Sequence, residues 1–239
     1  MPTHVALLRG INVGGKNKLP MKELVAIFAG AGCADVRSYI QSGNVVFHAS
    51  EKLAPCLPAL VATAIAERFG WRVPVVMRTA DELREVSEHN PFLAAGPVAR
   101  TRVTRPAIGP RAWEVPGSAT GPRAWEVPGS ATGPRAWEVP GSATGPRAWD
   151  IGATGTLDPA TLHVMFLADQ PSRTRAATLD PERSPGDAFA LRGRDIYFRL
   201  STGVARTRLT NDYFDTKLGT VSTGRNWNTV LRLLELAEE

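Results

Sequence analysis

Three polar segments carry the residues best suited to bind a ligand, because they combine glycines with amide and cationic side chains. They span residues 9–18, 41–44 and 223–228. Segments of this kind offer backbone N–H groups, amides and positive charge to an anion. We expect these segments to meet in one electropositive hollow. The candidate anion-binding residues are Arg9, Asn12, Gly14, Gly15, Lys16, Lys18, Gln41, Ser42, Asn44, Arg225, Asn226, Trp227 and Asn228.

The first segment has the glycine and lysine spacing of a phosphate-binding P-loop, from Gly10 to Lys16. However, Asn17 stands where that loop needs a hydroxyl to hold Mg²⁺. Pro20 also indicates a helix that begins several residues later than a P-loop allows. The pattern therefore favours a looser anion-binding loop over a true P-loop. The interpretation favoured over both is a tight turn in which the glycines supply positive φ and the lysines are solvated.

The other two segments have both a functional and a structural interpretation. Residues 41–44 are typical of a hairpin turn, since Gly and Asn tolerate left-handed geometry. Arg225 and Trp227 lie at a predicted helix start, where a cation and an aromatic ring can hold a phosphate and stack a base. Trp227 also shares an apolar stripe with Val230 and Leu234, so a core position is the alternative.

No complete catalytic constellation accompanies these segments. Asp212 and Asp215 share a helix face but lack a partner base, and Cys33 has no nearby histidine in sequence. The four histidines are far apart and none pairs at the spacing of helical metal ligands, so no metal or cofactor is indicated. Three functions stay open: a binding module for an anionic ligand, an enzyme of unassigned chemistry on a phosphorylated substrate, and a structural or interaction scaffold.

Composition indicates a globular protein without a membrane segment. The 239 residues are 43% apolar and 21% charged, which excludes disorder of the whole chain. The formal charge of +5 is compatible with a nucleotide, a phosphorylated metabolite or nucleic acid as partner. However, a surplus of three positive charges lies between Arg100 and Asp150, so an ordinary surface charge is the favoured interpretation. No basic leader and no run of about 18 apolar residues is present, so we expect a cytoplasmic location and no membrane partner. The oligomeric state stays open.

The elements that must position these residues form two similar halves. The first half predicts strands at 5–8, 36–40, 45–47 and 73–77, and helices at 20–30, 56–69 and about 80–88. The second half predicts strands at 162–168, 188–191 and 195–200, and helices at 173–179, after Thr210 and after Asn226. The order β-α-β-β-α-β is the split βαβ of ferredoxin-like folds. The predicted fold class is therefore α+β with two ferredoxin-like lobes.

A tandem repeat separates the two halves. The segment 109–120 recurs without change from Gly121 and from Gly133, and a fourth copy begins at Gly145. Its prolines and glycines oppose a helix, and no unit carries an apolar stripe, so a flexible, disordered insertion is predicted. The alternative is a Trp-bearing strand or docking tail. We predict an N-terminal lobe at 1–98, the insertion at 99–156 and a C-terminal lobe at 157–239.

Several long motifs together resemble a bacterial family known as domain of unknown function 1697. The motifs cover almost the whole chain outside the repeat, and the repeat departs from the family pattern. The resemblance implies an α+β fold and supplies no established activity or catalytic residue. The motifs that carry it lie at 5–22, 39–47, 73–79, 90–92, 209–214 and 225–229.

Overall fold

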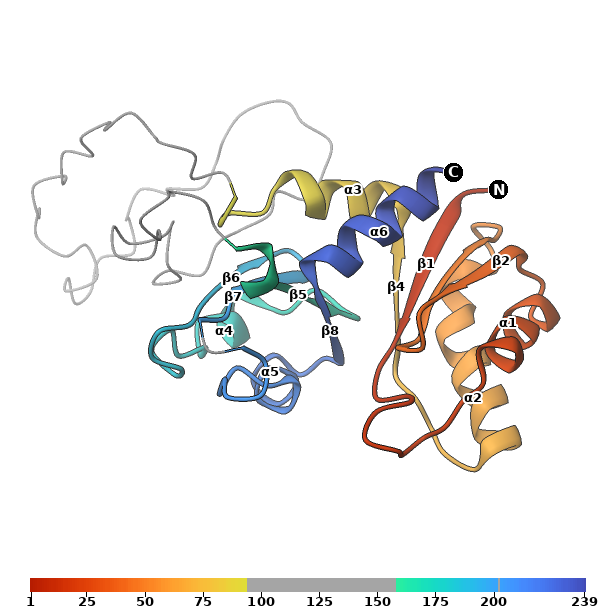
Figure 1. Ribbon diagram of the computed structural model, residues 1–239, viewed down its shortest axis with the longest axis horizontal. Helices are drawn as coiled ribbons and strands as arrows, with labels where there is room; N and C mark the ends of the chain where they lie inside the picture. The colour runs from red at the N-terminus through yellow and green to blue at the C-terminus, as the bar shows by residue number, and fades with distance from the viewer. Residues whose placement is uncertain (94–157, 202) are drawn as a thin grey trace, which may run out of the picture.

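The protein consists of two lobes, each built on a four-stranded antiparallel sheet (Figure 1). A computed structural model describes residues 1–93, 158–201 and 203–239. The tandem repeats, their predicted disorder and the predicted lobe boundaries lie outside these residues. The N-terminal lobe contains β1 (Thr3–Leu8), α1 (Met21–Gly30), β2 (Ala34–Tyr39), β3 (Asn44–His48), α2 (Leu57–Phe69) and β4 (Val75–Thr79), and α3 (Ala80–Glu88) follows.

The C-terminal lobe repeats this order of elements. Its sheet follows the path β6-β7-β5-β8, which corresponds strand for strand to β2-β3-β1-β4 of the first lobe. The mixed α and β content and the two lobes agree with the predicted fold class. The elements are β5 (Leu162–Leu167), α4 (Arg173–Ala176), β6 (Ala188–Arg192), β7 (Asp195–Arg199), α5 (Asn211–Leu218), β8 (Ser222–Asn226) and α6 (Trp227–Glu238).

Strand register makes two arginines equivalent. In the first lobe, Val5 of β1 pairs with Arg78 of β4. In the second lobe, Val164 of β5 pairs with Arg225 of β8. Each arginine directly precedes the residue that caps the next helix, α3 in one lobe and α6 in the other. The same position in the two lobes therefore carries the same side chain.

Local signals explain most element boundaries. Thr79 and Glu82 form the capping box that begins α3, as the sequence predicts. Strand β4 lies two residues later than predicted, because Pro74 has no N–H for the ladder. Helix α4 ends at Ala176 and is shorter than predicted. The sequence prediction missed β8, whose residues Ser222–Asn226 lack an apolar alternation and form a strand by pairing with β5.

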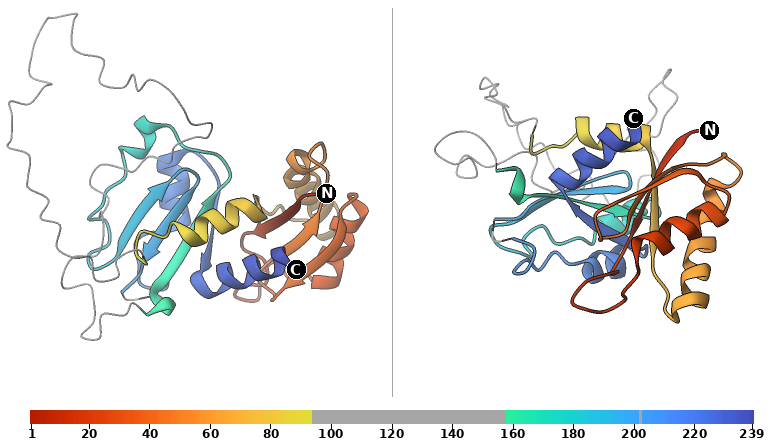
Figure 2. Two further views of the ribbon diagram at one scale, coloured as in Figure 1. Left: turned by 90° about the horizontal axis from the view of Figure 1, so that it is seen from above. Right: turned by 45° about the vertical axis from the view of Figure 1, so that its right-hand side comes forward.

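Apolar side chains form three cores. One lies between the N-terminal sheet and α1 and α2, and a second fills the C-terminal lobe beneath α5. The third is shared, because it joins β1, β3 and β4 of one sheet to β5 and β7 of the other through α3 and α6. Figure 2 shows α3 and α6 side by side between the two sheets. Within the described ranges, no helix is long and apolar enough to cross a membrane.

Candidate functional site

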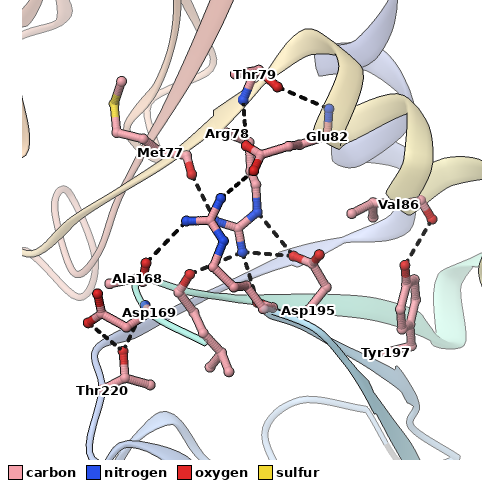
Figure 3. Close-up of polar contacts among 12 residues, drawn as sticks. Met77, Arg78, Thr79, Glu82, Val86, Ala168, Asp169, Asp195, Tyr197 and Thr220 are labelled. Atoms are coloured by element: carbon pink, nitrogen blue, oxygen red, sulfur yellow. Dashed lines mark hydrogen bonds and ion pairs between the residues drawn. The ribbon is translucent and has the colours of Figure 1, made fainter. Parts of the chain in front are cut away.

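The buried guanidinium of Arg78 joins the N-terminal lobe to the C-terminal lobe (Figure 3). Its side chain is 1% exposed, and Nε and Nη2 donate to Oδ1 of Asp195 at 3.1 and 2.8 Å. Nη2 also donates to the carbonyls of Leu167 and Arg194 at 3.0 and 2.8 Å, and Nη1 to that of Met77 at 2.8 Å. Every nitrogen of this buried cation is therefore satisfied, and part of its charge is neutralised by a carboxylate.

A second ion pair lies beside this junction and closer to solvent. Arg194 donates through Nη2 to Oε1 of Glu82, and through Nη1 to the carbonyl of Ala168 at 3.2 Å. The other oxygen of Glu82 accepts from the backbone N–H of Thr79 at 2.9 Å, which is half of the capping box. The side chains of Arg194 and Glu82 are 32% and 39% exposed. The pair is therefore held by α3 on one side and open to solvent on the other.

These two pairs border an inter-lobe cavity of about 300 Å³. Its walls come mainly from α3 and the β6–β7 hairpin, with Arg78 of β4 and the segment after β5, so both lobes contribute. Positive and negative side chains are equal in number, and His89, Gln170 and Tyr197 complete the polar lining. The charged lining residues are Arg78, Arg192, Arg194, Glu82, Glu85 and Asp195.

Burial changes the proton affinity of two groups at this cavity. Burial raises the pKa of Asp195, while the neighbouring Arg78 guanidinium opposes that rise. Burial also raises the pKa of Tyr197, whose hydroxyl donates to the carbonyl of Val86 at 3.3 Å. The phenol therefore stays neutral at physiological pH. Within the described residues, no group of three or more His, Cys, Asp or Glu side chains is arranged to hold a metal ion.

The equivalent arginine, Arg225, belongs to the C-terminal lobe and binds acceptors of the N-terminal lobe. Nε donates to Oδ1 of Asn44 at 2.5 Å, and Nη2 donates to the carbonyls of Leu8, Ser42 and Gly43 at 2.8, 3.2 and 3.3 Å. Within its own lobe, Nη1 donates to the Thr223 hydroxyl and the Gly224 carbonyl at 2.9 and 2.8 Å. All these acceptors are neutral, and burial lowers the pKa of Arg225 to about 10. The group is still protonated at neutral pH.

The predicted residues from 41 to 44 lie at this second junction. Asn44 is fully buried, and its amide donates to the carbonyl of Tyr39 at 3.1 Å and to the hydroxyl of Ser42 at 2.9 Å. Gly43 has a φ of 77°, and a Cβ there would lie 2.7 Å from the Cβ of Leu8. The turn therefore needs glycine both for its backbone and for its close approach to β1.

The loop between β1 and α1 uses part of its polar groups for its own structure. Nη1 of Arg9 donates to Oδ2 of Asp215 at 2.5 Å, which adds another contact between the lobes. The amide of Asn12 donates to the carbonyls of Leu19 and Gln41 at 2.9 Å, and its oxygen accepts from the N–H of Leu19. The exposed part of this loop includes the predicted residues Gly14, Gly15, Lys16 and Lys18.

The structure thus brings some predicted residues together and separates others. Ser42, Asn44 and Arg225 are in direct contact, and Asn12 reaches Gln41. Asn226 caps α6, Trp227 packs in the shared core at 3% exposure, and Asn228 is exposed. None of the predicted residues lines the inter-lobe cavity.

Sequence reasoning missed the residues of the charged cavity. Arg78 is a lone charge that continues an apolar strand, and Asp195 begins the second strand of a hairpin. One signal was present: Arg78 and Arg225 each stand immediately before a helix-capping residue. The importance of these two arginines becomes visible only when the two halves of the sequence are aligned with each other.

Comparison with known proteins supports the family and the fold. Residues 1–108 match the model of a family described as a protein of unknown function, DUF1697, which confirms the resemblance over these residues. The structure is also similar to that of the conserved bacterial protein SP0830 from Streptococcus pneumoniae, with a TM-score of 0.58 and 16% identity. That alignment covers 100% of this chain and 99% of the other. No match is found among curated proteins.

Proposed function

We propose that the protein binds a small ligand with an anionic group in the inter-lobe cavity. The family that matches residues 1–108 has no known function, so the proposal depends on the site itself. The main support for this proposal is the Arg194–Glu82 ion pair, which borders the cavity. Each lobe contributes one of the two side chains, and both are about one-third exposed. Enclosed sites between two lobes with a few convergent polar groups are common ligand sites.

Arg194 is the group that would receive the anion. Arg78 already uses all of its nitrogens inside the protein and is buried, so it acts as support for the site. Arg194 keeps an exposed edge, and a guanidinium can hold a carboxylate or phosphate through two parallel hydrogen bonds. A bound anion would compete with Glu82 for this edge.

The exposed tip of the β1–α1 loop supports a second anion site. Lys16 and Lys18 are exposed and make no ion pair within the described part of the chain. Gly14 and Gly15 have φ of 58° and 76°, so their backbone is free of side chains and open to an approaching ligand. A nucleotide or nucleic-acid phosphate is the partner that suits two flexible cations on a loop.

We also propose that each lobe is ferredoxin-like. The support is the order β-α-β-β-α-β in both halves, together with two sheets of the same strand order. In that interpretation α3 and α6 are additions after the fourth strand of each lobe. Their place between the sheets then explains why the cavity lies between the lobes and not within one of them.

The test is ligand binding by arginine and lysine variants. A thermal-shift screen would use inorganic phosphate, nucleotides, sugar phosphates and free amino acids, since a ligand at 100 times its Kd adds about 2.7 kcal/mol of stability. Any hit would be measured by calorimetry with Arg194→Gln, with Lys16→Ala/Lys18→Ala and with Arg232→Gln. Arg232 is a matched control, because it also forms an exposed ion pair, with Glu235.

We expect Arg194→Gln to weaken binding at least about tenfold and Arg232→Gln to leave it unchanged, because a charged hydrogen bond contributes about 1.5–3 kcal/mol. Loss of binding only in the lysine variant would place the ligand on the loop. Normal binding by Arg194→Gln would show that the cavity proposal is wrong.

A further inference from the structure

The charges around the inter-lobe cavity are balanced, and this balance restricts the ligand. Three arginines and three carboxylates line the space, so a ligand with a single charge gains nothing from the net field. An anion that takes Arg194 would leave Glu82 without its cation. A cation that takes Glu82 would leave Arg194 without its anion. Either exchange replaces one ion pair by another and leaves a carboxylate or a guanidinium unpaired.

A ligand with both charges avoids this loss. Its anionic group can pair with Arg194 while its cationic group pairs with Glu82, so one ion pair becomes two. Glu82 is suited to this exchange, because its second oxygen stays bound to the N–H of Thr79 and keeps the carboxylate in place. The helix cap therefore holds one half of the pair while the ligand separates the two halves.

Glu85 supplies a second carboxylate for a cation. It lies one helical turn from Glu82 on α3 and lines the same cavity. Its side chain is exposed and makes no hydrogen bond or ion pair within residues 1–93, 158–201 and 203–239. An ammonium group between Glu82 and Glu85 would have two anionic acceptors.

We propose that the ligand of this cavity is a small zwitterion of the α-amino-acid type, with its carboxylate on Arg194 and its ammonium on Glu82 and Glu85. This inference rests on the proposed function, since it uses the same cavity and the same arginine. The cavity volume of about 300 Å³ corresponds to about ten water molecules, which suits a ligand of roughly that number of heavy atoms.

The experiment compares each free amino acid with derivatives that lack one charge. The free amino acids with uncharged side chains are first ranked by thermal shift on the full-length protein. The best is then measured by calorimetry beside its N-acetyl derivative, which keeps only the carboxylate, and its α-amide, which keeps only the ammonium. The variants are Glu85→Gln and the control Glu88→Gln, an exposed glutamate of the same helix that does not line the cavity.

We expect each derivative to bind about tenfold more weakly than the parent amino acid, as for loss of one charged hydrogen bond. Glu85→Gln should weaken the parent about tenfold and leave the N-acetyl derivative unchanged, and Glu88→Gln should change neither. Both glutamates are exposed, so the unliganded melting temperatures of the variants should match that of the parent protein.

Three results would contradict the proposal of a zwitterionic ligand. The first is equal affinity for the parent amino acid and its N-acetyl derivative, and the second is an unchanged affinity of Glu85→Gln for the parent amino acid. The third is that no amino acid with an uncharged side chain binds. If phosphate or another simple anion still binds and Arg194→Gln abolishes that binding, the proposed function holds while this inference fails. If no anionic or zwitterionic probe binds, both fail together.

Discussion

The two arginine junctions occupy equivalent positions and differ in the charge of the side chain that each arginine binds in the other lobe. Arg78 meets a carboxylate at the first residue of β7, Asp195, whereas Arg225 meets an amide at the first residue of β3, Asn44. Both arginines also bind the carbonyl at the end of the opposite lobe's first strand, that of Leu167 or Leu8. The backbone geometry is thus shared, and the charge of the junction is set by a single side chain.

The connections beside the two junctions also differ. At the Arg225 junction, Ile11 of the long β1–α1 loop packs against Gly43, and the turn is closed by apolar contact. At the Arg78 junction, the corresponding connection between β5 and α4 is short, and Arg194 stands where the first lobe has Gly43. One junction is therefore a packed structural contact, and the other opens into a charged cavity. Duplicated geometry can serve stability in one place and leave room for a ligand in the other.

The largest effect is expected from Arg78→Met. The substitution leaves the buried Asp195 carboxylate without its cation, which should cost about 3–5 kcal/mol of unfolding free energy at pH 7. Because the stranded carboxylate can take up a proton, part of the loss should be recovered at pH 5. Urea unfolding at both pH values measures this. Arg78→Met/Asp195→Leu, which removes both charges, should regain most of the stability; no recovery would contradict the ion-pair account.

Arg225→Met should have a smaller effect of a different kind. It removes six hydrogen bonds to neutral acceptors, and the buried carbonyls and amide that lose a donor should cost about 2–4 kcal/mol in total. No titratable group accepts from Arg225, so the loss should be the same at pH 5 and pH 8. A pH-dependent loss in the same urea experiment would mean that an anion neutralises this guanidinium after all.

Exchanging the carboxylate and amide partners of the two arginines tests how much the charge of the partner contributes to each junction. Asn44→Asp gives Arg225 an anion but removes the amide that donates to Tyr39 and Ser42, so we expect a loss of about 1–3 kcal/mol. Asp195→Asn keeps an oxygen for both hydrogen bonds from Arg78, and should cost about 1 kcal/mol or less, within the range for a neutral hydrogen bond. Thermal unfolding of the two variants compares them directly. A costlier Asp195→Asn would show that Arg78, unlike Arg225, needs a charged partner.

The smallest effect concerns two histidines at another equivalent position, His4 of β1 and His163 of β5. Burial lowers the pKa of both below the ordinary value of 6.5. In acid the unfolded chain therefore takes up these protons before the folded chain does, and stability should fall as the pH drops below about 6.5. His4→Phe should reduce this fall between pH 7.5 and pH 5.5, as measured by urea unfolding at the two pH values. An unchanged pH profile in His4→Phe would exclude His4 as a source of acid sensitivity.

Local sequence signals predicted most of the fold. The capping box of Thr79 and Glu82, the apolar spacing of α1 and α2, and the Asn226 cap of α6 depend on neighbours in the chain, and each is confirmed. Strand β8 was missed because its polar residues become a strand only through pairing with β5, far away in sequence. The resemblance to the DUF1697 family was recognisable from long motifs, and the family model matches residues 1–108.

The candidate site was harder to predict, because its geometry depends on contacts between distant residues. Arg225 and Asn44 were named as ligand-binding residues, yet the structure pairs them with each other across 181 positions of sequence. Arg78 and Asp195 are 117 positions apart, and neither stands in a recognisable motif. Side-chain type indicated which residues can bind an anion. It could not indicate which of them the protein already uses internally.

The position of α6 has a consequence for how the chain is made. This helix follows the last strand of the second lobe, yet it packs on β1 and β3 of the first, and the carbonyl of Leu236 accepts from Arg37 of β2. A growing chain on the ribosome therefore leaves the part of this sheet face that α6 covers exposed until α6 emerges. We therefore expect chaperones to bind the nascent N-terminal lobe, and we expect α6 added as a separate peptide to reduce this binding.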